Sequence, residues 1–118
     1  MSQYLIIINM DEKAQAKATV EQHKEIAASY GTYTAELKSA GVFLAGEGLE
    51  PSNSGARIRF QEGRRVVTDG PFAEAKEVVG GFYLIEAKSR DEAIEWAAKC
   101  PGAKHAGVEV RSVMTYPK

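Results

Sequence analysis

The residues with the most distinctive chemistry gather in one segment, residues 68–77. There Asp69 is followed by Gly70 and Pro71, an order typical of turns, because the carboxylate accepts from nearby backbone N–H groups while glycine relaxes φ and proline fixes it. Pro71 could equally open a short helical turn with Asp69 near its cap. Asp69 is therefore a candidate general base as well as a candidate turn cap, and the base role needs a pKa that burial has raised towards the working pH.

Further charged residues lie in two predicted strands. Glu47 belongs to one strand, and Glu109 and Arg111 alternate with Val108 and Val110 in another. If the two valines face the helices, Glu109 and Arg111 point to the opposite side of the sheet, because side chains alternate along a strand. Unpaired charges are costly to bury. These residues therefore form either a structural ion pair at an interface or part of a ligand pocket.

The two histidines have different settings. His23 precedes Ile26 and Tyr30 by three and seven residues, which places it near the apolar face of a helix, as a packing or a catalytic residue. His105 lies among glycine, alanine and lysine residues, and we expect it to be solvated.

Patterns for metals, nucleotides and nucleic acids are lacking. One cysteine and two distant histidines supply no cluster of soft metal ligands, and Gly46-Glu47-Gly48 is too short for a nucleotide-binding fingerprint. Phe82 and Tyr83 are adjacent and so cannot stack bases from one face of a strand. The arginines of residues 57–65 are typical of a solvated edge that prevents strand aggregation. We expect no metal, no cofactor and no nucleic acid.

Length and composition indicate one domain, residues 1–118, with a net charge of −1 and an ordinary apolar fraction of 44%. The longest apolar run, residues 4–8, is far short of the roughly 20 residues that cross a bilayer. Neither a signal peptide nor membrane binding is expected. Because Cys100 is the single cysteine, no intramolecular disulfide can form, and a cytoplasmic location is expected.

The elements that must position these residues follow from the apolar spacing. Residues 3–9 predict a strand buried on both faces, and residues 20–40 a helix with Ile26, Tyr30, Tyr33 and Leu37 on one side. Gly41 is expected to end this helix. Strands follow at residues 42–49, 79–85 and 108–113, and a hairpin at residues 57–67. In the strand at 42–49, Phe43, Ala45, Glu47 and Leu49 are predicted to share one face.

A second helix is predicted to start at the capping-box spacing of Ser89 and Glu92 and to end at Lys99, with Ile94, Ala97 and Ala98 turned inward. The element order then predicts an α+β, ferredoxin-like split βαβ repeat with a hairpin insert and both helices on one face of the sheet. The chain is too short for a third layer, so we expect a second copy to cover the open face, giving a homodimer.

The chain resembles the YCII-related family, in particular the branch named after its Asp-Gly-Pro-Phe motif. The resemblance covers nearly the whole chain. The residues that carry it are Asp69-Gly70-Pro71-Phe72-Ala73-Glu74, Lys76-Glu77, Gly80-Gly81-Phe82-Tyr83, Ala40-Gly41-Val42, Gly46-Glu47-Gly48-Leu49-Glu50-Pro51 and Glu109-Val110-Arg111-Ser112-Val113.

The resemblance implies a dimeric α/β barrel and a cleft with a catalytic role. For the wider family it implies a His–Asp pair, and for this branch a regulatory setting beside extracytoplasmic-function sigma factors. Ala75 stands where the branch often has threonine, so a catalytic hydroxyl is missing there.

These observations predict a homodimer that binds a small organic molecule in a polar cleft between the sheet and residues 69–77. It would transfer a proton without a cofactor. The alternative is a non-catalytic ligand sensor or protein-interaction module in transcriptional regulation. The predicted catalytic residues are Asp69, as base or orienting group, Glu47 as its partner carboxylate, and His23. The predicted ligand-binding residues are Lys76 or Arg111 for an anion, with Glu109, Phe72 and Tyr83.

Overall fold

The structure is a computed structural model that describes residues 1–72 and 77–117. The strands are β1 (Ser2–Met10), β2 (Phe43–Gly48), β3 (Ala56–Gln61), β4 (Arg64–Asp69), β5 (Val78–Ala87) and β6 (Val108–Ser112). The helices are α1 (Glu12–Ala16), α2 (Val20–Ser39) and α3 (Arg90–Lys99), with 3₁₀ turns η1 (Ser52–Ser54) and η2 (Pro101–Lys104). No described helix is both long and apolar enough to cross a membrane.

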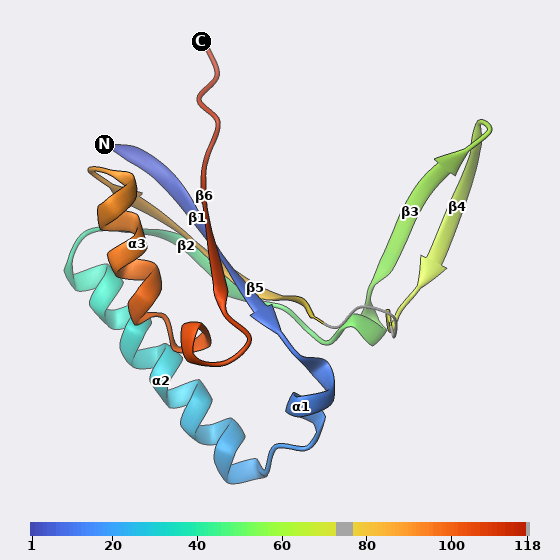
Figure 1. The fold of residues 1–118 in the computed structure, drawn as a ribbon, viewed down its shortest axis with the longest axis horizontal. Coiled ribbons are helices and arrows are strands. Elements are labelled where there is room, and N and C mark those ends of the chain that lie inside the picture. Colours follow the sequence, from blue (N-terminus) through green and yellow to red (C-terminus); the bar gives the residue numbers. More distant parts are fainter. Residues whose placement is uncertain (73–76, 118) are drawn as a thin grey trace.

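Four strands form one antiparallel sheet in the order β2-β5-β1-β6 (Figure 1). The two central strands, β1 and β5, each begin a strand–helix–strand unit, which is the predicted ferredoxin-like arrangement. Strands β3 and β4, which come between β2 and β5 in the sequence, form a separate two-stranded sheet.

Local sequence signals fix the ends of the two long helices. Thr19 and Gln22 form a reciprocal capping box at the start of α2, and Gly41, with φ of 75°, follows its end. The Ser89 side chain accepts a hydrogen bond from the Glu92 backbone N–H at the start of α3. The predicted helix boundaries are confirmed.

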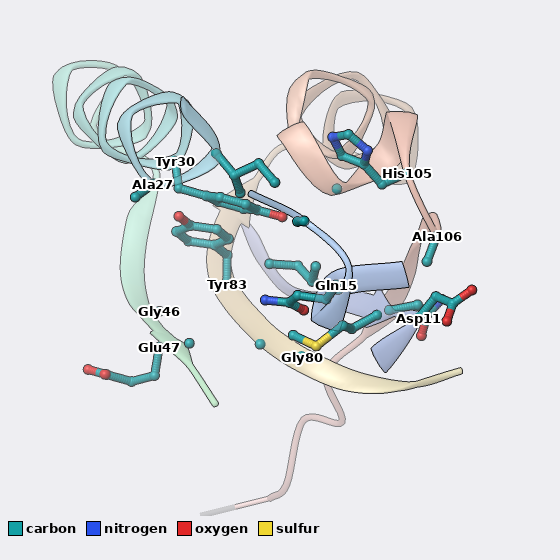
Figure 2. Close-up of a pocket in the computed structure, with 18 of the residues that line it drawn as sticks. Asp11, Gln15, Ala27, Tyr30, Gly46, Glu47, Gly80, Tyr83, His105 and Ala106 are labelled. Carbon is teal, nitrogen blue, oxygen red and sulfur yellow. The ribbon is translucent and has the colours of Figure 1, made fainter. Parts of the chain in front are cut away.

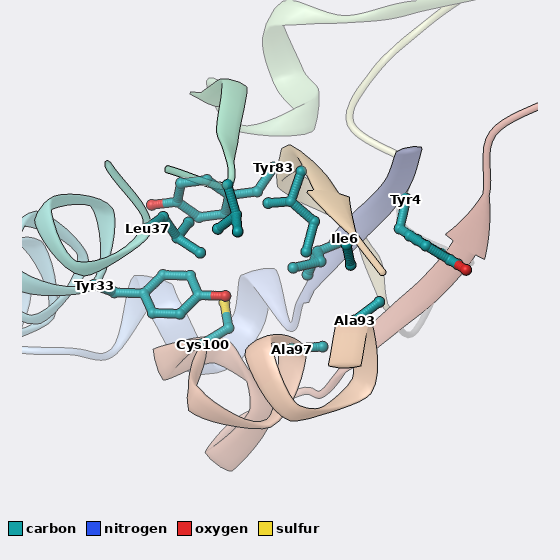
Figure 3. Packing of buried hydrophobic residues seen from close by; sticks show 11 residues of the cluster. Tyr4, Ile6, Tyr33, Leu37, Tyr83, Ala93, Ala97 and Cys100 are labelled. Carbon is teal, nitrogen blue, oxygen red and sulfur yellow. The ribbon is translucent and has the colours of Figure 1, made fainter. Parts of the chain in front are cut away.

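The core lies between the two helices and one face of the sheet, as predicted (Figure 3). Ile6 and Ile85 are fully buried on the sheet, and Tyr33 and Leu37 of α2 pack against the same cluster. The α3 prediction was wrong in part, since Ile94 and Ala98 are exposed and the inward row is Ala93, Ala97 and Cys100. These residues are four and three apart and small, so the helix packs closely on the sheet.

The other face of the sheet has no cover within the described chain. Leu5 pairs with Leu84, and Ile7 with Phe82; directly paired residues share a face, and all four are only partly buried. The prediction that residues 3–9 are buried on both faces is therefore wrong for the isolated chain. We call this surface the open face.

Strand β2 has an irregularity that changes its predicted facing. Phe43 pairs with Ile85, but the next pair is Ala45 with Leu84, so the strand carries one extra residue at Leu44. Phe43 consequently packs against the core, while Ala45 turns to the open face. The prediction that Phe43 and Ala45 share a face was wrong because the alternation is broken between them.

Strands β3 and β4 form a hairpin that projects from the body (Figure 1), and we call residues 56–69 the arm. Its turn is Glu62-Gly63, with positive φ at both residues, as a two-residue hairpin turn requires. The radius of gyration is 16.3 Å, against about 13 Å for a compact chain of this length. The projecting arm and the C-terminal segment after β6, which also extends from the body, both add to this value (Figure 1).

Candidate functional site

A cleft of about 1490 Å³ opens on the helix-covered side of the sheet. Its walls are α2 on one side and η2 with the following loop on the other, and β1, β2 and β5 form its floor (Figure 2). Residues of α1 lie at its mouth. The cleft is large enough for a small organic molecule.

The cleft exists because α2 is longer than the core it covers. The buried residues of α2, Tyr33 and Leu37, belong to its second half, whereas residues 20–29 are all exposed. The shorter α3 ends at Lys99, and across the cleft from α2 lie the short turn η2 and the loop that follows it. Ile26 and Ala27, which a full helical layer would bury, line the cleft instead.

Two hydroxyl groups are ordered in the cleft wall. The Thr34 hydroxyl donates to the Tyr30 carbonyl oxygen at 2.8 Å and lies 2.7 Å from the Tyr83 hydroxyl oxygen. Because a threonine hydroxyl has one proton, Tyr83 is the donor to Thr34. The Tyr83 oxygen therefore has only acceptor capacity left for a ligand.

The ring of Tyr83 is fixed by its neighbours. Tyr33 meets it edge-on at 5.2 Å between ring centres, and Phe43 does so at 6.3 Å. A Cβ at Gly46 would lie 2.6 Å from the Tyr83 ring, so the ring occupies space that only glycine leaves free. Tyr33 in turn donates from its hydroxyl to the Trp96 carbonyl oxygen at 2.7 Å.

Burial raises the pKa of Tyr30 and of Tyr83, and also that of the Cys100 thiol. In each case the cause is loss of hydration, which disfavours the charged form. All three groups are therefore protonated and neutral near pH 7. They can take part in hydrogen bonds, but they do not supply a ready base.

Charged groups are found at the rim. Lys38 lies over the Phe43 ring, 5.1 Å from its centre, and Lys17 and Glu25 are exposed lining residues. The Asp11 carboxylate accepts from backbone N–H groups at the start of α1. His105 is exposed as predicted, at the end of η2, and lines the cleft (Figure 2).

Two predicted site residues, Glu47 and Tyr83, line this cleft. Tyr83 points into it, whereas the Glu47 side chain is directed away from it (Figure 2). Glu47 pairs with Phe82 in the sheet, which places it at the border between the cleft and the open face.

Phe72 and Glu77 line a second hollow of about 520 Å³. The Arg57 guanidinium stacks on the Phe72 ring at 3.7 Å from its centre. Within the Asp-Gly-Pro-Phe motif the backbone of Gly70 is closely packed, since a Cβ there would lie 1.8 Å from the Ser52 carbonyl oxygen. The Gly70-Pro71 peptide bond is cis.

The other predicted site residues line neither hollow. Asp69 is exposed at the end of β4, and His23 is exposed on α2. Glu109 and Arg111 point to the open face, where they form an ion pair of 2.9 Å that is largely exposed. Lys76 lies outside the described residues. The roles predicted for these residues stay predictions.

Sequence reasoning placed Tyr30 in the core and did not consider Thr34. Both line the cleft, and they follow Gln22 and Ile26 at intervals of four along α2. This row on one helical face was a usable signal. The sequence indicated where α3 ends along the chain, but not how far along α2 that end would lie.

Among the described residues, no group of three or more histidine, cysteine or acidic side chains could hold a metal ion. The described side chains also leave no buried nitrogen or oxygen atom without a hydrogen-bond partner. The described part of the cleft wall thus offers neutral hydroxyl and aromatic groups, with charges at its edge.

This fold and cleft define a class: a ferredoxin-like α+β protein with one helix-covered face, one open face and a cleft beside the longer helix. A family model described as YCII-related domain matches residues 2–117. The chain therefore belongs to the YCII-related family. It is also similar to a protein of Rhizobium meliloti (strain 1021) named "Uncharacterized protein R00369", with 30% identity over 115 residues, covering 96% of this chain and 93% of the relative.

Proposed function

We propose that this YCII-related protein binds a small organic molecule in the cleft beside α2. The observation that carries the proposal is the ordered Tyr83–Thr34 hydroxyl pair in the wall of a cleft of about 1490 Å³. A few fixed polar groups in a largely apolar hollow are typical of small-molecule sites. No cofactor takes part in this proposal.

The chemistry of the wall suggests which ligands fit. Tyr83 offers an acceptor oxygen, because its own proton is used by Thr34. Lys17 and Lys38 lie at the rim. A ligand with a hydroxyl or amine donor at one end and an anionic group at the other would satisfy both.

Proton transfer on that molecule is the more specific proposal. It requires a base, and Glu47 is the predicted catalytic carboxylate that lines the cleft. Asp69 and His23, which line neither hollow, are proposed with it as more distant members of the site.

A non-catalytic sensor is the second candidate, and the raised pKa values of Tyr30 and Tyr83 favour it. Neutral hydroxyl groups hold a ligand without activating it. The Glu47→Gln variant separates the two: an enzyme loses turnover and keeps binding, whereas a sensor has no turnover to lose.

We further propose that the protein is a cytoplasmic homodimer of the Asp-Gly-Pro-Phe branch. The partly buried apolar residues of the open face support the dimer. The lone, buried Cys100 suits a reducing compartment.

The test of the cleft uses 1-anilinonaphthalene-8-sulfonate, an apolar anionic fluorophore. Ala27 lines the cleft and is exposed, so Ala27→Trp fills the cleft without disturbing the core. We expect its affinity for the fluorophore to fall at least about tenfold, measured by fluorescence titration.

Ala28→Trp is the matched control, because Ala28 is the next residue of α2, is equally exposed and does not line the cleft. It should bind the fluorophore as the unaltered protein does. Equal binding by both variants would show that the fluorophore binds elsewhere and would remove the support for the cleft.

A further inference from the structure

The arm is an amphipathic ribbon. In its register Ile58 lies opposite Val67 and Phe60 opposite Arg65, and residues paired in this way share a face. One face therefore carries Ile58, Phe60 and Val67, which are 60%, 69% and 50% exposed. We call it the apolar face of the arm.

The opposite face of the arm is basic. Arg57 pairs with Thr68, Arg59 with Val66, and Gln61 with Arg64. Three arginines thus share this face, and one of them, Arg57, is stacked on Phe72 at the base of the arm. The stack fixes the arm's base to the body by its basic face and leaves the apolar face uncovered.

An exposed ribbon of this kind needs a partner. A two-stranded hairpin is marginal by itself in water, and every residue of β3 and β4 is exposed. The arm cannot fold back on its own open face, because it projects away from the sheet (Figure 1).

The open face has the matching properties. It presents Leu5, Ile7, Phe82 and Leu84, all partly exposed, and carboxylates lie on the same face, since Glu47 pairs with Phe82 and Glu86 with Gln3. The arm has four arginines against two carboxylates, a net charge of +2. The whole chain has −1, so the rest carries −3.

We propose that the arm of one chain lays its apolar face on the open face of a second copy of the same chain. Ile58, Phe60 and Val67 cover the apolar strip, and Arg65, the cation on that face, meets the carboxylates of the second copy. Because each chain carries one arm and one open face, two chains satisfy each other reciprocally. This inference rests on the homodimer proposed above. It shares Glu47 with the proton-transfer proposal, but it does not use the Tyr83–Thr34 wall of the ligand cleft.

Sedimentation velocity over a range of concentrations tests the arm. We expect a dimer for the unaltered chain, and dimerisation weakened at least about thirtyfold in the double variant Ile58→Asp, Phe60→Asp, because interface aromatics carry much of the binding energy. Both positions are exposed, so the fold should be kept, as circular dichroism would verify.

The matched control is Gln61→Asp, Thr68→Asp, which adds the same two charges on the basic face of the arm. It should remain dimeric. The proposal is overturned if the Ile58→Asp, Phe60→Asp variant still dimerises. It is also overturned if the unaltered chain is a monomer and sediments with phosphatidylserine vesicles instead.

Photo-crosslinking identifies what the arm touches. With p-benzoylphenylalanine in place of Phe60, a mixture of ¹⁴N- and ¹⁵N-labelled chains should give crosslinks between chains to the peptide of residues 77–88, which contains β5. Crosslinks confined to the other arm contradict the proposed contact even if a dimer forms. If the cleft binds the fluorophore, the Ile58→Asp, Phe60→Asp variant should bind it as the unaltered protein does. The arm proposal and the cleft proposal can therefore fail separately.

Discussion

At the scale of single residues, the cleft depends on a close approach between Gly46 and Tyr83. The Tyr83 ring lies where a side chain at position 46 would be, and its hydroxyl reaches Thr34 only from that position. Gly46 was read in the sequence as part of a motif too short to bind a nucleotide. Its role is instead to leave room for an aromatic ring from the neighbouring strand.

We predict that Gly46→Ala destabilises the fold by about 1–3 kcal/mol, the usual cost of forcing extra atoms into a packed site. A Cβ there would lie 2.6 Å from the Tyr83 ring, so the ring must move. Gly48→Ala in the same strand is the control, because its Cβ would meet nothing within 4 Å. Urea unfolding measures both, and equal costs would mean that β2, rather than the ring, resists the change.

Individual site residues were the hardest part to predict. Tyr83 and Glu47 were named from the sequence, and both line the cleft. Asp69 was named from its motif, yet it is exposed at the end of β4. A motif reports which residues occur together, but which cavity they border depends on strand register and on where a distant helix ends.

At the scale of elements, the sequence was a better guide. The long helix at 20–40, the hairpin and the outer strands were all predicted, because apolar periodicity and caps are local properties. The polar residues 11–19 favour neither a loop nor a helix by periodicity, and the structure has the short helix α1 there. The error in β2 came from one inserted residue, which periodicity alone does not reveal.

One contact between elements fixes α1 to the loop before the arm. Glu12 of α1 accepts from the Ser52 backbone N–H at 2.6 Å and from the Ser52 hydroxyl at 2.5 Å. The Ser52 hydroxyl oxygen also accepts from the Phe72 backbone N–H at 3.4 Å. The mouth of the cleft and the base of the arm are thereby joined through a single carboxylate.

We predict that Glu12→Gln speeds hydrogen exchange at the Ser52 amide, because a neutral amide is the weaker acceptor. The Ser52 hydrogen bonds lower the pKa of Glu12 in the folded chain. The link is therefore complete above the ordinary pKa of 4.5 and is lost as the pH falls through the lower, folded value. The Ser52 amide resonance should titrate with Glu12 below pH 4.5 in the unaltered protein only.

Glu21→Gln is the control for this contact, since Glu21 lies in the first turn of α2 and is exposed. It should leave Ser52 exchange unchanged. If Glu12→Gln also leaves hydrogen exchange at the Ser52 amide unchanged, α1 is held by its Asp11 cap and not by the Glu12 carboxylate.

At the scale of the whole molecule, the described residues cover one side of the sheet and leave its other side uncovered. The dimensions of 47 × 45 × 18 Å describe a flat body with a projecting arm. One face of the sheet is covered by a layer of helices, and the other exposes an apolar strip. We expect this arrangement in a subunit whose second sheet face is covered by another copy of the chain.

We predict that the unfolding temperature rises with protein concentration, by about 3–5 °C per tenfold, because a dimer that dissociates on unfolding is stabilised by mass action. Leu84→Arg places a charge on the open face and should abolish this dependence. Ala98→Arg adds the same charge on the exposed side of α3 and should keep it. Calorimetry measures the unfolding temperature. If it is independent of concentration in the unaltered protein, the proposal that a second copy covers the open face is wrong.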